Sequence, residues 1–227
     1  MSRNVEWVCN LIDGYIKENI SIWIPNAIAN VIILFYGKYN TMFDSDILNY
    51  KYKLDFMELI STKLKRNIRL NRIYSGLNNG FTCKDFHLKC RNKGPNIVLI
   101  KNEYQYIFGG YTSIPWESVQ TRRHVKDTSA FLFQINPFCK IFNQIENNNG
   151  RHAVRQYKIN SEWMLGYGNG CNLWISNKCN INRDSGSQTG TTYSYPDGPQ
   201  TLVGGPPIDD DIVYFGVKNM EVFQIFD

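Results

Sequence analysis

The sequence predicts a mainly β protein of the α+β class, a two-sheet antiparallel β-sandwich flanked by a few helices. Aromatic residues make up 14% of the 227 residues, and their side chains fit the pleated surface of a sheet. Short apolar segments follow residue 67, and clusters of Gly, Pro, Asn and Asp separate them. Helical periodicity is concentrated in the first 65 residues. This distribution is typical of two packed sheets.

The first 40 residues predict a helical hairpin. Apolar residues recur at helical spacing over residues 5–20, and Pro25 suits the first turn of a second helix over residues 26–36. Gly37 is the expected end of that helix. The second helix is apolar nearly all round and too short to stand alone, so we expect residues 1–40 to form a hairpin that docks on another surface.

The rest of the chain predicts a linker followed by one domain. Residues 41–53 are polar and aromatic without a period, and we interpret them as the linker. Residues 54–65 have the period of one more helix, which opens a domain over residues 54–227. A short link between the second and third strands predicts a hairpin. The strands are expected at residues 68–74, 96–101, 106–108, 130–135, 154–159, 172–175, 214–217 and 220–226.

The net charge of +5 is unevenly distributed along the chain. Residues 61–160 hold seventeen basic and five acidic residues, whereas the segments on either side hold more acidic than basic residues. Such a block favours an acidic partner, unless the fold interleaves the segments so that their charges cancel. No helix-turn-helix, zinc-finger or RRM signature accompanies the block, so we expect no nucleic-acid binding.

The sequence predicts a cytoplasmic chain with no transmembrane segment. The longest apolar run, residues 31–36, is far shorter than the ~20 residues that a membrane helix needs. The first twenty residues contain Glu6, Asp13, Lys17 and Glu18 and no apolar stretch typical of a secretory signal.

No motif predicts catalysis, a metal site or a cofactor. The six cysteines form no C-x-x-C pair, and we expect free thiols. His87 lies near Cys83 and Cys90, so a thiol-dependent redox enzyme with one of them as nucleophile stays an alternative. His124 is expected in a basic loop. The glycine run at 166–170 is also expected to be a loop, because a strand and not a phosphate-binding helix follows it.

Several sequence motifs occur in a distinctive order. They are FHLKC at 86–90, GPNIVLIK at 94–101, IFGGYTS at 107–113, Trp116, Asp127, AFLF at 130–133, NLWI at 172–175 after the glycine run, CNIN at 179–182 and EVFQI at 221–225. In this order they resemble the TLDc domain family, of the oxidation-resistance type, over residues 54–227. The predicted hairpin of residues 1–40 would then be an N-terminal extension.

The residues that carry the resemblance are interpreted as structural. They are Phe86, His87, Cys90, Gly94, Pro95, Phe108, Gly109, Gly110, Tyr111, Trp116, Asp127, Phe131, Phe133 and Glu221. The two adjacent glycines would permit a close backbone path or a bulge, and a binding role for the Gly-Gly-Tyr run is the alternative. The family usually has an Arg-Asp-Gly turn after the first strand, and residues 74–81 lack the Arg-Asp pair, so any function of that pair would be absent.

The resemblance implies a noncatalytic regulatory or protein-interaction domain without a cofactor. Members of the family are linked to oxidative-stress resistance, and several bind and regulate the vacuolar proton-pumping ATPase. The implied partner is therefore the peripheral sector of that ATPase, and the implied location is peripheral to an organelle or assembly. A structural subunit of a large assembly, joined through residues 1–40, is the alternative.

A cluster of basic residues between the last predicted N-terminal helix and the first strand is the candidate partner-binding surface. Its members are Lys63, Lys65, Arg66, Arg69 and Arg72. Inward-facing Leu59, Ile60 and Leu64 would leave Lys63 and Arg66 outside, and alternation along the strand separates Arg69 from Ile68 and Leu70. We therefore expect at least four of the five charges to reach solvent together. This surface, rather than a cleft, is the predicted interaction site, and it would speed encounter with an acidic partner.

Overall fold

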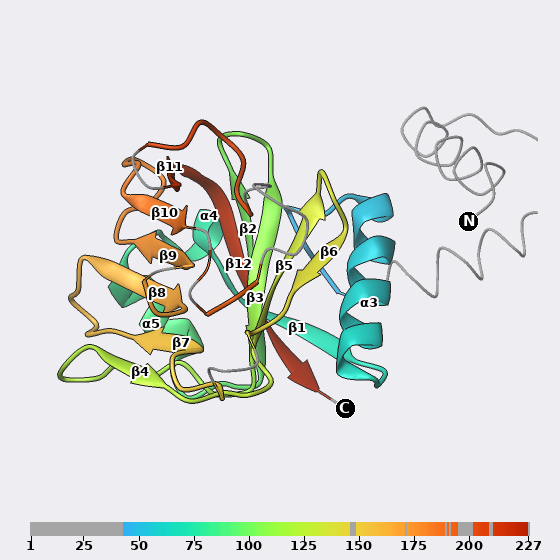
Figure 1. Ribbon diagram of the computed structural model, residues 1–227, viewed down its shortest axis with the longest axis horizontal. Coiled ribbons are helices and arrows are strands. Elements are labelled where there is room, and N and C mark those ends of the chain that lie inside the picture. Colours follow the sequence, from blue (N-terminus) through green and yellow to red (C-terminus); the bar gives the residue numbers. More distant parts are fainter. Residues whose placement is uncertain are drawn as a thin grey trace, which may run out of the picture. The chain divides into compact units, whose positions relative to one another are not determined.

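Two six-stranded antiparallel sheets face each other in the computed structural model (Figure 1). The structure describes residues 43–145, 149–170, 172–188, 190, 192–194, 202–208 and 211–226. The hairpin predicted for residues 1–40 lies outside the described residues. Within the described part of the chain, the predicted fold class is confirmed.

The first sheet has the strand order β1-β12-β2-β3-β5-β6. Its strands are β1 (Arg69–Ser75), β2 (Asn96–Asn102), β3 (Ile107–Thr112), β5 (Phe131–Asn136), β6 (Lys140–Phe142) and β12 (Val217–Phe226). The predicted hairpin of the second and third strands is confirmed, since β2 and β3 pair antiparallel with Lys101 opposite Ile107.

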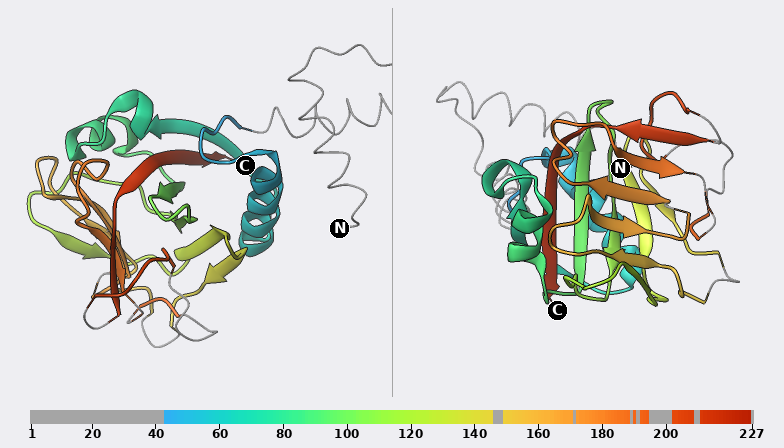
Figure 2. Two further views of the ribbon diagram at one scale, coloured as in Figure 1. Left: turned by 90° about the horizontal axis from the view of Figure 1, so that it is seen from above. Right: turned by 90° about the vertical axis from the view of Figure 1, so that its left-hand side faces the viewer.

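The second sheet has the strand order β11-β10-β9-β8-β7-β4. Its strands are β4 (Arg123–Val125), β7 (Val154–Gln156), β8 (Trp163–Tyr167), β9 (Leu173–Ser176), β10 (Ser185–Gln188) and β11 (Ile212–Phe215). Figure 2 shows the two sheets from above and from the side. Side chains from both sheets form the core between them.

The central strands of the first sheet are buried on both faces. In β2, Val98 and Ile100 pack into the core between the sheets, whereas Ile97 and Leu99 face the outer side. That outer side is covered by Phe56 and other residues of the helix α3 (Tyr50–Leu64). A strand that is covered on both faces has a continuous run of apolar residues, and this run made β2 recognisable in the sequence.

Helix α3 begins earlier than the sequence predicted. Asn49 caps it, because its side chain accepts a hydrogen bond from the Tyr52 backbone N–H at 3.0 Å. Before the cap, Phe43, Ile47 and Leu48 are buried against the outer face of the first sheet. The expectation of a linker over residues 41–53 is therefore wrong for residues 43–53. Residues 43–48 are held by tertiary contacts with the sheet, which leave no local period, and residues 50–53 are the first residues of α3.

Two further helices follow β1. They are α4 (Gly76–Asn79) and α5 (Cys83–Cys90), and α5 carries His87. Thr82 and Asp85 form a capping box at the start of α5. The α5 side chains of Phe86 and Cys90 pack into the core between the sheets.

Four strands were not predicted from the sequence. They are β4, β6, β8 and β10, and three of them are only three or four residues long. His124 lies in β4 rather than in a loop, and Gly166 and Tyr167 belong to β8. The later part of the same glycine run is a loop, as expected, with φ of 86° at Gly168 and 76° at Gly170. These four strands, of which β8 and β10 contain glycine, form because neighbouring strands pair with them.

Candidate protein-docking surface

The basic residues predicted to bind a partner lie where α3 turns into β1. Lys65 ends the helix in a left-handed conformation with φ 55°, and the chain then enters β1 at Arg69. The side chains of Lys63, Lys65, Arg66 and Arg69 are exposed. These four residues are called the basic patch below, and the expectation that at least four of the five charges reach solvent is confirmed.

Arg72 was predicted to be part of the exposed basic surface, and this prediction is wrong. Its side chain is only 16% exposed, and its guanidinium forms ion pairs with Asp44, Asp46 and Glu221. The distances to the Asp46 and Glu221 carboxylates are 2.7 Å. Strand alternation places Arg72 on the face of Leu70, which packs against the α3 side of the sheet. The same alternation that exposes Arg69 could have identified Arg72 as inward-facing.

Members of the basic patch also contact the domain itself, and Arg66 hydrogen-bonds the Tyr111 side chain. The Lys63 Nζ donates to Asn143 Oδ1 at 2.5 Å and lies 5.7 Å from the centre of the Phe131 ring. Its ammonium group is thus fixed over the end of β6, although the side chain remains exposed.

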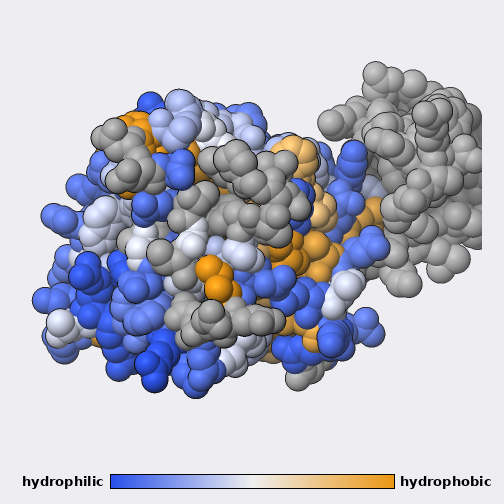
Figure 3. All heavy atoms as spheres, viewed as in Figure 1, coloured by the Kyte–Doolittle hydropathy of each residue, from blue (hydrophilic) through white to orange (hydrophobic). Residues whose placement is uncertain are grey.

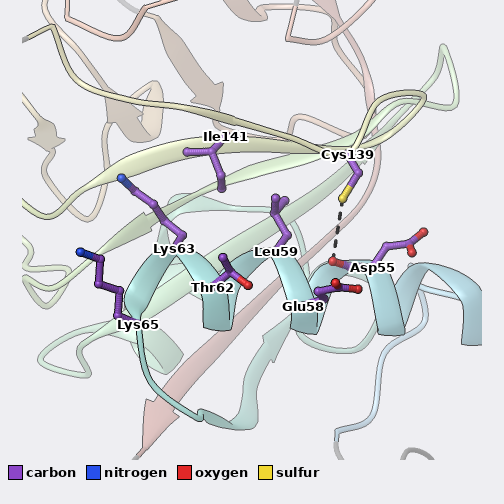
Figure 4. Close-up of a pocket in the computed structure, with 8 residues that line it drawn as sticks. All are labelled: Asp55, Glu58, Leu59, Thr62, Lys63, Lys65, Cys139 and Ile141. Carbon is purple, nitrogen blue, oxygen red and sulfur yellow. Dashed lines mark hydrogen bonds between the residues drawn. The ribbon is translucent and has the colours of Figure 1, made fainter. Parts of the chain in front are cut away.

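A groove of about 540 Å³ runs between α3 and β6 beside the basic patch. It is lined by Asp55, Glu58, Leu59, Thr62, Lys63, Lys65, Cys139 and Ile141 (Figure 4). Figure 4 places Leu59 and Ile141 in the middle, the two lysines at one end and Asp55 at the other. Figure 3 shows hydrophobic surface beside α3 bordered by hydrophilic side chains. This feature, the α3 groove, was not found from the sequence, because its two walls are about 80 residues apart.

The acidic end of the α3 groove is electrostatically distinct from the basic end. Burial raises the pKa of the Asp55 carboxyl, while Lys51 lowers it and Glu58 raises it further. The Cys139 Sγ lies 3.8 Å from the Asp55 carbonyl oxygen. A docking segment would therefore meet an apolar floor with opposite charges at its two ends.

The aromatic motif residues lie in the core. Phe86 and Trp116 pack edge to face, with ring centres 5.8 Å apart, and the Trp116 indole donates to Asn96 Oδ1 at 2.7 Å. Phe131 and Phe133 are fully buried on the α3 side of the first sheet, where Tyr111 stacks on Phe131. Phe108 is buried between the sheets. These side chains supply packing area, and none of them lines the α3 groove.

The glycine motif residues are confined by close contacts. A Cβ at Gly109 would lie 1.8 Å from the Val98 carbonyl oxygen, and one at Gly110 would lie 2.5 Å from the Tyr167 ring. The Tyr167 hydroxyl also donates to the Gly110 carbonyl at 3.0 Å. A Cβ at Gly94, which precedes Pro95, would lie 2.8 Å from the Pro115 nitrogen. The close backbone path expected at the glycine pair is present in the fold.

Asp127 organises the loops at one end of the first sheet. Its carboxylate accepts five hydrogen bonds from Thr112, Ser113 and Ser129 at 2.6–3.0 Å. Burial alone would raise the pKa of Asp127, but these hydrogen bonds outweigh it and hold the pKa below its usual value. The carboxylate is therefore engaged within the fold and is charged at neutral pH.

Glu221 lies fully buried in the centre of β12. Its carboxylate accepts from Ser45 Oγ at 2.6 Å, from the Asp46 N–H at 2.7 Å and from Arg72. Burial raises the pKa of Glu221, although all three partners favour the charged carboxylate. Glu221 and Arg72 thus tie residues 43–48 to the first sheet.

The cysteine and histidine residues considered for catalysis do not form a dyad in the described part of the chain. His87 is 2% exposed, its ring nitrogens have no hydrogen-bond partner there, and burial lowers its pKa to about 4. Burial raises the pKa of the Cys83 thiol to about 12 and raises that of Cys90 as well. A thiolate nucleophile is disfavoured at both positions. The described residues also contain no group of three or more His, Cys, Asp and Glu side chains that could hold a metal ion.

Alkylation of the folded chain at pH 7 is expected to distinguish the exposed thiol from the buried thiols among the described cysteines. Cys139 is exposed and should react, whereas buried Cys83, Cys90 and Cys179 should stay unmodified until the protein is denatured. Peptide mapping by mass spectrometry after timed iodoacetamide treatment measures each site. Labelling of Cys83 or Cys90 as fast as Cys139 would instead support the redox-enzyme alternative.

Comparison with known proteins places this fold in a family. Residues 41–226 match the TLDc domain family. The chain is also similar to the MTOR-associated protein MEAK7 of Danio rerio, with 36% identity over 53 residues. That match covers 23% of this chain and 11% of the zebrafish protein. No helix in the described residues is long and apolar enough to cross a membrane. Because the family match spans most of the chain, including both sheets and α3, this chain belongs to the TLDc domain family.

Proposed function

We propose that this chain is a noncatalytic regulatory domain that binds an acidic face of a protein partner through the basic patch and the α3 groove. The observation that carries the proposal is the clustering of four exposed cations beside an apolar groove. Exposed like charges speed encounter with an acidic partner, and adjacent apolar surface supplies the contact area that holds it.

The partner that we propose is the peripheral sector of the vacuolar proton-pumping ATPase, at the cytoplasmic surface of an organelle. This assignment rests on the functions of other TLDc proteins, together with their link to oxidative-stress resistance. The zebrafish relative is named for an association with MTOR, which makes MTOR the second partner to test.

Charge reversal in the basic patch is expected to weaken this binding selectively. The double variant Lys65→Glu/Arg66→Glu should lower the association rate with purified ATPase peripheral sector about tenfold at low salt, because it removes electrostatic steering. The difference should shrink as salt screens the charges. Thermal stability should fall only slightly, since both side chains are exposed and Arg66 loses a hydrogen bond to Tyr111. Surface plasmon resonance with the full chain and a thermal melt measure the two quantities.

The matched control reverses two exposed charges on α5. Lys84→Glu/Lys89→Glu changes the net charge equally but lies outside the basic patch. We expect this control to bind like the wild type. Equal weakening by both double variants, or none by either, would reject the basic patch as the binding surface. Failure of the wild type to bind the ATPase sector would instead reject the partner.

A further inference from the structure

A second hollow, of about 280 Å³, lies on the outer face of the second sheet. Its lining combines four aromatic rings with two arginines. The lining residues are Arg122, Arg155, Tyr157, Trp163, Gly170, Trp174, Gln188, Ile212 and Tyr214. It is called the arginine–aromatic hollow below, and the function proposed above makes no use of it.

The hollow is built on one cross-strand row of residues. Strand pairing places Arg155 opposite Gly166, Gly166 opposite Trp174, Trp174 opposite Gly186, and Gly186 opposite Tyr214. Directly paired residues point to the same face of a sheet, so all five share the outer face. Both residues directly paired with Trp174 are glycines, which leaves room for its indole to lie over the sheet between Arg155 and Tyr214.

The indole of Trp174 is held in place on the sheet. A Cβ at Gly186 would lie 2.2 Å from Trp174 Cζ2, so the ring lies over that glycine. The Trp174 Nε1–H donates to the Asp184 carbonyl at 2.8 Å, and the Tyr214 ring packs edge to face against it at 5.8 Å. On the other side, a Cβ at Gly166 would have the Tyr157 hydroxyl as its nearest atom, at 3.2 Å. The aromatic surface is therefore preorganised beside a shallow gap, which lowers the entropy lost on binding.

The charge of the hollow is positive. None of the described residues that line it carries a carboxylate. The Arg155 side chain is anchored with Nη2 3.1 Å from His124 Nε2, while Arg122 is exposed and forms no ion pair with any described carboxylate. Burial and the neighbouring Arg155 lower the pKa of His124 to about 4, so the histidine is neutral near pH 7. The positive charge at neutral pH thus comes from the two arginines.

From these observations we infer that the arginine–aromatic hollow binds an acidic peptide segment that places an aromatic side chain next to carboxylates. The aromatic side chain packs against Trp163 and Tyr214, beside the largely buried Trp174 indole, and a carboxylate pairs with Arg122. Trp, Tyr and Arg are the residues that dominate the energetics of protein interfaces. The volume is below the range of roughly 300–1,000 Å³ that small-molecule and cofactor sites occupy, and it suits one or two anchoring side chains.

A peptide fits the hollow better than single-stranded nucleic acid does. Nucleic-acid surfaces of that kind combine successive stacking rings with a basic groove that follows the phosphates. Here the rings surround a single hollow, and its described lining contains two cations, Arg122 and Arg155. The site also lies on the second sheet, whereas α3 covers the outer face of the first sheet (Figure 1). Occupation of the hollow and of the basic patch are therefore separable events.

The experiment uses the full chain and the blocked peptide acetyl-Asp-Glu-Phe-Asp-Glu-amide as probe. Indole N–H resonances of tryptophan report on the site by NMR, with buried Trp116 as the internal control. We expect saturable shifts of the Trp163 and Trp174 resonances and none at Trp116. The analogue with Ser in place of Phe should bind about tenfold more weakly, because it lacks the ring that packs against the exposed aromatic lining of the hollow.

Variants assign the binding to the hollow. Arg122→Glu should weaken the peptide about tenfold, and Tyr214→Ala should weaken it as well, while Lys65→Glu in the basic patch should bind like the wild type. Arg122 and Tyr214 are exposed, so both variants should fold, and a thermal melt checks this. The inference is overturned if the peptide gives no shift at millimolar concentration, or if Lys65→Glu weakens it as much as Arg122→Glu. It is also overturned if an eight-nucleotide oligothymidylate shifts both indoles at lower concentration than the peptide.

Discussion

Gly109→Ala is expected to destabilise the domain by about 4 kcal/mol or more, which is a large part of the stability of a typical domain. The added methyl would lie 1.8 Å from the Val98 carbonyl oxygen, on the adjacent strand of the first sheet. No rotamer change relieves this overlap, because the opposing atom belongs to the backbone. Strands β2 and β3 would have to separate at the centre of the sheet. Thermal melting should show a fall of roughly 10 °C or more in Tm.

Gly216→Ala is the matched control for that substitution. A Cβ at Gly216 would have the Asn182 carbonyl oxygen as its nearest atom, at an ordinary contact distance of 3.4 Å. We expect a change of about 0.5 kcal/mol or less for this variant. The explanation fails if the two variants melt at the same temperature, since the close approach at Gly109 would then carry no cost.

Glu221→Gln should lower the free energy of unfolding by about 3 kcal/mol, because it leaves Arg72 without its buried carboxylate. The amide keeps the shape of the side chain but turns one acceptor into a donor. That donor would face the N–H and O–H groups of Asp46 and Ser45 or the Arg72 guanidinium, all of which donate to the native carboxylate. Urea unfolding followed by tryptophan fluorescence measures the loss.

Asp44→Asn tests whether the expected stability loss of Glu221→Gln is due to the burial of the Glu221 carboxylate. Asp44 pairs with the same guanidinium, but its side chain is 75% exposed, and exposed pairs contribute about 0–1 kcal/mol. We expect this variant to unfold close to the wild type. Hydrogen exchange at the amides of Asp46, Ile47 and Leu48 should accelerate in Glu221→Gln and stay slow in Asp44→Asn. Equal stability losses in the two variants would contradict the buried carboxylate as the anchor.

The anchor formed by Glu221 and Arg72 also supports the proposed docking surface. It fixes residues 43–48 on the outer face of the first sheet, beside the helix that carries the basic patch. A variant that releases this segment would expose apolar side chains such as Phe43 next to the docking surface. Binding assays on Glu221 variants should therefore be compared only after their folding is verified.

Local sequence patterns determined much of the fold. The apolar run of residues 97–100 and the short link after it identified the β2–β3 hairpin, because a strand buried on both faces has no polar positions. The ordered motifs from Phe86 to Glu221 identified the family. Exposure of Lys63, Lys65, Arg66 and Arg69 followed from the periods of a helix and a strand.

The contacts between distant segments were decided by the tertiary structure alone. The three acidic partners of Arg72 are 26 to 149 residues away from it in the sequence, and no local pattern specifies such pairs. The short strands β4, β6, β8 and β10 are strands because their neighbours pair with them. The row from Arg155 to Tyr214 likewise requires the register of five strands. The sequence by itself therefore determined the longer helix and strand segments of the described domain and the family to which the chain belongs. The buried ion pairs, the α3 groove and the arginine–aromatic hollow depend on strand register and sheet packing, because only these bring side chains from separate segments together.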